Sequence, residues 1–162
     1  MTHASPLKAP TPRIDIREFM GLMPDVYEAM GAIGKAAVKA GLEESLIELV
    51  KIRASQINGC AYCLQYHLNL AAKLQVMQEK LDLLAVWREA PHFSTRERAA
   101  LAWAEALTVI THGVSDDLYA DVRTEFSDKE LAYLTSAVGL INAWNRYGAA
   151  MQWAPPKRAR AG

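Results

Sequence analysis

Apolar residues recur every three to four positions along most of this 162-residue chain. This spacing matches the turn of an α helix, whereas a half-buried strand would alternate apolar and polar residues strictly. No Asn-Gly or Asp-Gly pair lies between β-branched runs, as it would in a hairpin. The pattern therefore predicts an all-α fold, with helices over residues 15–22, 24–40, 43–58, 60–74, 79–89, 95–112 and 128–151, and a short one that starts near residue 115.

Local signals fix several of the predicted helix ends. Ser94 and Ser127 each precede a glutamate by three positions, which is the spacing of a capping box. Gly59 marks a C-terminal stop, because glycine tolerates the left-handed conformation that often follows a last helical turn. The helix over 43–58 has a wide apolar face and is predicted to be deeply packed. The helix over 128–151 is apolar nearly all round and is predicted to be interior.

Length and composition indicate a single domain. With 51% hydrophobic residues the chain can bury a core without disulfide staples, and no repeat divides it. We predict a helical domain over residues 15–153, between flexible segments at 1–14 and 154–162. The last segment holds the only basic cluster: Lys157, Arg158 and Arg160. Large aromatic residues at the end of the last helix are predicted to pack in the core rather than against another subunit: Trp144, Tyr147 and Trp153.

The charge balance argues against two classes of partner. Eighteen basic and eighteen acidic side chains cancel, so no broad positive field attracts nucleic acid or anionic lipid. Residues 1–12 contain neither a signal-peptide core nor a membrane span. We therefore expect a cytoplasmic protein with no nucleic-acid or membrane partner. Because structural disulfides are uncommon there, the two cysteines are expected to be catalytic, metal-binding or inert.

The two cysteines stand three positions apart, as Cys60-Ala-Tyr-Cys63. On a helix, side chains at this spacing lie about 5–6 Å apart at Cβ, so a disulfide can form and break with modest adjustment. The stop at Gly59 places Cys60 at the start of a helix, where free N–H groups and the helix dipole stabilise a thiolate. His67 lies one turn after Cys63, within reach of its sulfur as a base. The helix terminus favours Cys60 as the attacking sulfur and the imidazole favours Cys63, so the residues alone leave the order open.

The stretch from Glu48 to His67 resembles a known redox motif. Its segments Glu-Leu-Val-Lys-Ile-Arg-Ala-Ser (48–55) and Asn-Gly-Cys-Ala-Tyr-Cys-Leu-Gln-Tyr-His (58–67) are similar to the AhpD core within the carboxymuconolactone decarboxylase-like family. The glutamate, the cysteine pair and the histidine fall where that family's redox residues fall. The clearest likeness covers residues 43–73.

The resemblance implies an AhpD-like helical bundle that acts as a thiol-dependent alkyl hydroperoxidase, with peroxiredoxin activity, in antioxidant defence. By the same resemblance Cys63 attacks the peroxide, Cys60 resolves the sulfenate into a disulfide, and Glu48 with His67 relays protons. If Glu48 faces inward, its pKa is expected to be raised by burial. Without the resemblance, Glu48 belongs to a polar stripe typical of a solvated helix face: Glu44, Glu48, Lys51 and Ser55.

One position departs from the family pattern. Tyr62 stands between the cysteines, where the alkylhydroperoxidase D pattern has a histidine. A phenol with a pKa of about 10 donates a hydrogen bond but is a poor base at neutral pH. We therefore expect slower peroxidase turnover or a different preferred oxidant.

The chain carries no nucleotide-binding fingerprint, since Gly139 stands alone and the other glycines lie at predicted turns. We accordingly expect no cofactor, and electrons supplied by a separate dithiol protein. The resemblance implies a lipoyl-bearing or thioredoxin-like reductant, and a homo-oligomer that is a trimer or a hexamer.

Three other hypotheses remain at this stage. The first is a decarboxylase of aromatic catabolism, although relatives with that activity lack the cysteine pair. The second is a metal site, with a fourth ligand added to the cysteines and the nearby histidine; its candidate ligands are Cys60, Cys63, His67, and one of Glu48, His92 and His112. The third is a redox sensor or disulfide carrier, for which the same thiol chemistry suffices. His3 is assigned no role.

Overall fold

The computed structural model describes residues 9–158, and over this range the chain forms helices and turns without a strand. This confirms the all-α prediction. The helices are α1 Ile16–Leu22, α2 Pro24–Lys39, α3 Glu44–Asn58, α4 Ala61–Lys73, α5 Gln78–Leu83, α6 Thr95–Thr108, α7 Asp116–Glu125 and α8 Asp128–Met151, with short 3-10 turns η1 Leu84–Val86 and η2 Ile110–His112. None of these helices is long and apolar enough to cross a membrane. The predicted flexible ends lie partly outside the described residues, at 1–8 and 159–162.

Helix α3 lies at the centre of the bundle and packs against α4, α6 and α8. Leu46 and Val50 belong to a core shared with α2, α6, α7 and α8. Leu49 and Ile52 face a second core, which α4, α5 and α6 complete. Because apolar side chains leave α3 in both directions, the helix is buried nearly all round, as its wide apolar face predicts.

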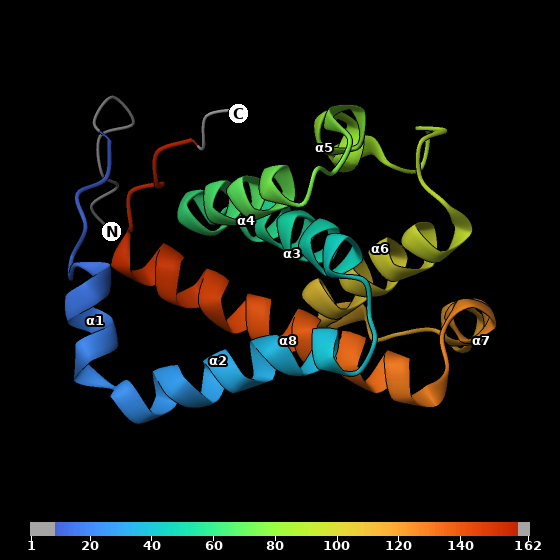
Figure 1. Ribbon diagram of the computed structural model, residues 1–162, viewed down its shortest axis with the longest axis horizontal. Coiled ribbons are helices and arrows are strands. Elements are labelled where there is room, and N and C mark those ends of the chain that lie inside the picture. Colours follow the sequence, from blue (N-terminus) through green and yellow to red (C-terminus); the bar gives the residue numbers. More distant parts are fainter. Residues whose placement is uncertain (1–8, 159–162) are drawn as a thin grey trace.

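Helix α8 is the longest helix and runs along the length of the molecule, with α2 on one side and α3 and α4 on the other (Figure 1). The prediction that it is interior holds for only part of its surface. Small residues leave one side of α8 exposed: Ala132, Ser136 and Gly139. Apolar composition predicted burial here, but these short side chains expose little apolar area to water.

The C-terminal end of α8 is covered by aromatic residues of α1 and α2. Phe19 lies 5.4 Å from both Tyr147 and Trp153, and Tyr27 lies 6.2 Å from Trp144, measured between ring centroids. Trp153 is buried, while Trp144 and Tyr147 are half-buried. Each of the three large aromatic residues therefore packs against rings of its own chain, and Trp153 lies in the core as predicted.

Two predicted helices end earlier than expected. The helix expected over 79–89 leaves α-helical geometry after Leu83, and the one expected over 95–112 does so after Thr108. In the first case the chain tightens into η1, and the carbonyl oxygens of Val86 and Trp87 accept hydrogen bonds from the backbone N–H groups of Glu89 and Ala90, three residues later, so 3-10-type turns replace the last α-helical turns. In the second case the Thr108 side chain accepts a hydrogen bond from Asn142 and is buried against α8, and the chain tightens into η2.

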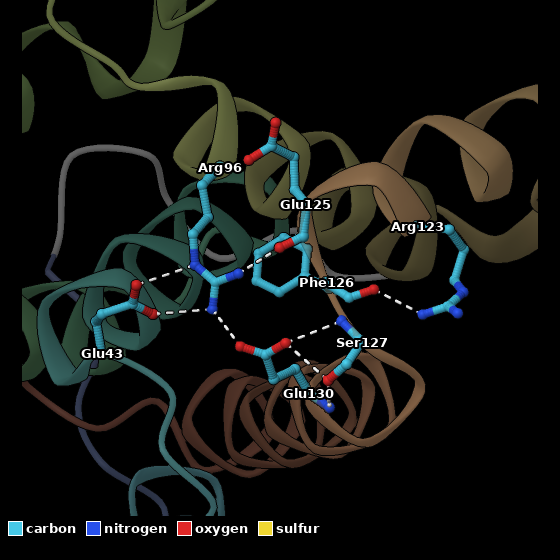
Figure 2. A network of polar contacts seen from close by, with 7 residues as sticks. All are labelled: Glu43, Arg96, Arg123, Glu125, Phe126, Ser127 and Glu130. Carbon is cyan, nitrogen blue, oxygen red and sulfur yellow. Dashed lines mark hydrogen bonds and ion pairs between the residues drawn. The ribbon is translucent and has the colours of Figure 1, made fainter.

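Arg96 of α6 ties together three other elements (Figure 2). Its guanidinium binds the Glu43 carboxylate just before α3, the Glu125 carbonyl oxygen at the end of α7, and Glu130 in the first turn of α8. The guanidinium carbon also lies 4.1 Å from the Phe126 ring centroid. Glu130 completes the predicted capping box of α8, and the box before α6 also forms.

Glu130 makes acid stability testable. Hydrogen bonds from the Ser127 hydroxyl and backbone N–H, and then the Arg96 guanidinium, lower the pKa of Glu130 from 4.5 to about 2. Since the folded state lowers this pKa, ionised Glu130 stabilises the fold above pH 4.5, and that contribution is lost as the pH falls toward 2. We expect Glu130→Gln to lower the free energy of unfolding at pH 7 and to match the wild type near pH 2, as measured by urea denaturation. Exposed Glu79→Gln is the control; an undiminished effect of Glu130→Gln at pH 2 would contradict the assignment.

Candidate active site

The two cysteines lie at the junction of α3 and α4. Gly59 ends α3 with a φ of 67°, in the left-handed conformation that the predicted stop requires. Cys60 is the N-cap of α4, and its Sγ accepts a hydrogen bond of 3.2 Å from the backbone N–H of Cys63. The two sulfurs are joined in a disulfide, with the Cα atoms 5.4 Å apart. The cysteine spacing therefore does place a disulfide at a helix N-terminus.

The disulfide is buried against the backbone of α8. Cys60 is 2% exposed and Cys63 is 4% exposed. The carbonyl oxygen of Trp144 lies 3.6 Å from Cys63 Sγ. A Cβ atom at Gly148 would lie 2.6 Å from Cys60 Sγ and 3.2 Å from Cys63 Sγ, so only glycine fits there. No sequence motif marks this residue, and its one signal is a glycine inside an apolar helix.

A buried carboxylate, an imidazole and an ammonium group form a chain beside the disulfide. Oε2 of Glu48 lies 2.6 Å from Nδ1 of His67, and Oε1 of Glu48 accepts a hydrogen bond of 2.9 Å from Lys51 Nζ. Glu48 is 3% exposed and His67 is 8% exposed. The structure thus brings Glu48 and His67 together, as the resemblance implied. The alternative interpretation, that the polar stripe on this helix is solvated, is wrong at Glu48 and Ser55.

The pKa of Glu48 in this hydrogen-bonded group differs from the one expected. Burial raises the pKa of Glu48, but the His67 hydrogen bond and the His67 and Lys51 charges outweigh burial and leave that pKa below 4.5. The expected raised pKa is therefore wrong. Burial lowers the pKa of His67 below 6.5, against the opposing effect of Glu48. At neutral pH, Glu48 is ionised and His67 is neutral, so Nδ1 carries the proton donated to Glu48 and Nε2 is free to accept one.

A cavity of about 860 Å³ opens onto this group. Cys63 and His67 line it, whereas Cys60 does not. Tyr62 also lines the cavity, with its ring stacked on Tyr66 at 6.2 Å between centroids. Burial raises the pKa of Tyr62 above 10, so its phenol stays protonated and cannot replace a histidine as base. The sulfur accessible to a ligand is that of Cys63.

Asparagine side chains fix the position of α8 behind the site. Asn145, only 1% exposed, donates a hydrogen bond of 3.0 Å to Ser55 Oγ and accepts one of 2.9 Å from Asn58. Asn58 also donates to Asn142. The backbone N–H of Cys60 in turn donates to the carbonyl oxygen of Ser55. Sequence reasoning missed these residues, because asparagines on an apolar helix carry no motif.

No group of three or more histidine, cysteine, aspartate or glutamate side chains is arranged to hold a metal ion between residues 9 and 158. His92 lies in the turn before α6 and is separated from α4 by α5 and η1, and His112 lies in η2, after α6. His3 lies outside the described residues.

The close approach of α8 to the disulfide predicts a large effect of one methyl group. We expect Gly148→Ala to lower the free energy of unfolding of the oxidised protein by about 1–3 kcal/mol, the usual cost of overpacking. Gly139→Ala on the same helix is the control, because its Cβ meets nothing within 4 Å. The control should be neutral or more stable by up to about 1 kcal/mol. Equal stabilities of the two variants in urea denaturation would show that α8 can withdraw from the disulfide.

The pKa of His67 can be tested by removing each of its two charged neighbours, Glu48 and Lys51. By NMR titration we expect a value below 6.5 in the wild type. Glu48→Gln should lower it further, because the carboxylate favours the imidazolium, and Lys51→Met should raise it, because the ammonium opposes that charge. A wild-type value above 6.5, or shifts of the same sign in both variants, would contradict the charge assignment.

Comparison with known proteins places this site in a family. The model of the carboxymuconolactone decarboxylase family matches residues 24–106. The uncharacterized protein YdfG of Bacillus subtilis (strain 168) is 33% identical over 131 residues, which span 80% of this chain and 89% of that protein.

Solved structures extend the comparison to the fold. A candidate AhpD antioxidant defence protein of unknown function from Agrobacterium tumefaciens has 34% identity and a TM-score of 0.83, over 91% of this chain and 100% of that one. The debrominase Bmp8, in its apo form, has 22% identity and a TM-score of 0.76, over 85% of this chain and 74% of that one, and shares the fold. The chain belongs to the carboxymuconolactone decarboxylase family, and its core is AhpD-like.

Proposed function

We propose that this protein is a thiol-dependent hydroperoxidase that reduces organic hydroperoxides through the Cys60–Cys63 disulfide. The observation that carries the proposal is the exposure of Cys63 and neutral His67 to one cavity, with Cys60 bonded behind Cys63. The family includes enzymes of other activities by name, a decarboxylase among them. A decarboxylase needs no cysteine pair, whereas a peroxidase cycle uses both sulfurs.

The cycle begins with both cysteines reduced. Nε2 of neutral His67 accepts the Cys63 proton, and the thiolate attacks the terminal peroxide oxygen. The S–O bond forms as the O–O bond breaks, and the leaving alkoxide takes the proton to become an alcohol. Cys63 is then a sulfenic acid.

The second step regenerates the disulfide present in the structure. Cys60 loses its proton, its thiolate attacks Cys63 sulfur, and the S–S bond forms as the S–O bond breaks. The sulfenic oxygen leaves with the proton from Cys60, as water. The backbone N–H of Cys63 and the N-terminus of α4 stabilise the negative charge on Cys60. The Glu48 carboxylate holds the His67 ring in position, and its negative charge stabilises the imidazolium that forms when His67 is protonated.

An external dithiol must return two electrons. One of its thiolates attacks Cys63, the sulfur that faces the cavity, and expels Cys60 as a thiolate whose charge the helix N-terminus stabilises. Its second thiol then attacks the reductant's sulfur in this mixed disulfide, so that Cys63 leaves reduced and the reductant closes its own disulfide. We propose a lipoyl-bearing or thioredoxin-like protein in this role, acting on a homo-oligomer.

The proposal is tested by counting thiols in reduced protein before and after one equivalent of cumene hydroperoxide. We expect both thiols to be lost in the wild type. Cys60→Ser should stop at a Cys63 sulfenic acid that dimedone traps, and Cys63→Ser should retain its thiol. His67→Ala should slow the reaction at neutral pH by about 100-fold or more, the usual contribution of a general base. Two thiols that persist in the wild type would refute the proposal.

A further inference from the structure

The cavity beside Cys63 is far larger than a small peroxide needs. At about 860 Å³ it lies in the range of pockets that enclose whole organic molecules, whereas one water occupies about 30 Å³ of liquid. Aromatic rings make up much of its wall: Tyr27, Tyr62, Tyr66, Trp144 and Trp153. Gly31 also lines it, and a Cβ there would meet nothing within 4 Å. The cavity therefore suits a bulky apolar or aromatic body.

The charged residues of the cavity are mostly positive. Three lysines and one glutamate line it: Lys35, Lys39, Lys51 and Glu28. Lys51 is bonded to Glu48. Within residues 9–158, Lys35 and Lys39 make no ion pair, and their spacing of four places them on one face of α2. Two uncompensated ammonium groups thus border an otherwise apolar space.

These two lysines lie away from the reacting sulfur. Tyr27 contacts the Trp144 ring, and the Trp144 carbonyl lies 3.6 Å from Cys63 Sγ, so the first turn of α2 adjoins the sulfur end of the cavity. Lys35 and Lys39 follow Tyr27 by about 12 Å and 18 Å along the helix, at 1.5 Å per residue. Figure 1 shows α2 running along α8 from α1 toward the far end of the molecule. The cavity therefore has a sulfur end and a cationic end.

We propose that the cavity selects hydroperoxides with a long apolar body and a terminal carboxylate, such as fatty-acid hydroperoxides. The carboxylate contacts Lys35 and Lys39, the apolar body lies among the aromatic rings, and the peroxide reaches Cys63. The inference rests on the proposed hydroperoxidase function and adds the class of substrate. The carboxylate takes no part in the chemistry: the O–O bond breaks, Cys63 becomes a sulfenic acid, and a hydroxy acid leaves.

The test compares two probes that differ only in the charged group. Linoleic acid hydroperoxide and its methyl ester are reacted below their critical micelle concentrations with reduced protein, and the rate of thiol loss is measured; hydrogen peroxide is the third oxidant. We expect the acid to react about tenfold faster than the ester, the combined effect of two exposed ion pairs. The preference should fall with added salt.

Variants assign the effect to the lysines. In Lys35→Met/Lys39→Met the ratio of acid to ester rates should approach one, with folding checked by circular dichroism. Lys129→Met removes one positive charge from an exposed site outside the cavity and should keep the wild-type ratio. Gly31→Leu should slow both linoleate probes, because its side chain would occupy the cavity.

The results that would contradict the carboxylate assignment differ from those that would contradict the hydroperoxidase proposal. Equal rates for acid and ester, or a preference that survives in the double variant, would overturn the carboxylate assignment and leave the hydroperoxidase proposal standing. Failure of all three oxidants to consume the thiols would overturn the hydroperoxidase proposal itself.

Discussion

The contact between the α8 backbone and the cysteine pair is the constraint on which the site depends. Gly148 leaves room for both sulfurs, and one added methyl group would enter the space of Cys60. Asn145, one turn earlier, binds Ser55 and Asn58 at the end of α3 and so fixes the register of α8. Satisfied polar groups in a buried interface are costly to displace, because each would lose its partners without gaining water. The disulfide is therefore held between three helix segments rather than on a free loop.

The same buried setting explains the charges. A carboxylate as buried as Glu48 would be strongly disfavoured alone, but two donors, His67 and Lys51, compensate it. Its charge is thus retained, and the imidazole beside it stays neutral because burial outweighs the attraction of the carboxylate. Burial alone would have predicted a protonated Glu48. The hydrogen bonds from His67 and Lys51 therefore decide that Glu48 is ionised, and they leave Nε2 of His67 free beside the cavity.

The sequence allowed accurate prediction wherever the determinants were local. Capping serines, the Gly59 stop and the apolar period of α3 act within a few residues, and the helices follow them. The failures have long-range causes. The helix over 95–108 ends where the Thr108 side chain accepts a hydrogen bond from Asn142 of α8, and Gly148 matters only because α8 meets sulfurs more than 80 residues earlier in the chain. Glu48 could be found only through family resemblance, because its partner His67 lies on a different helix.

The order of the two sulfurs shows how local and tertiary effects combine. The N-terminus of α4 stabilises a thiolate on Cys60, and this alone would make Cys60 the nucleophile. The cavity reaches Cys63 and not Cys60, which is why Cys63 is the sulfur proposed to meet an external oxidant or reductant first. Thiolate stabilisation at Cys60 and access to the cavity at Cys63 do not conflict if the two cysteines have different roles. In the proposed cycle, a stabilised Cys60 thiolate is a good leaving group when a dithiol attacks Cys63, since a lower thiol pKa speeds departure.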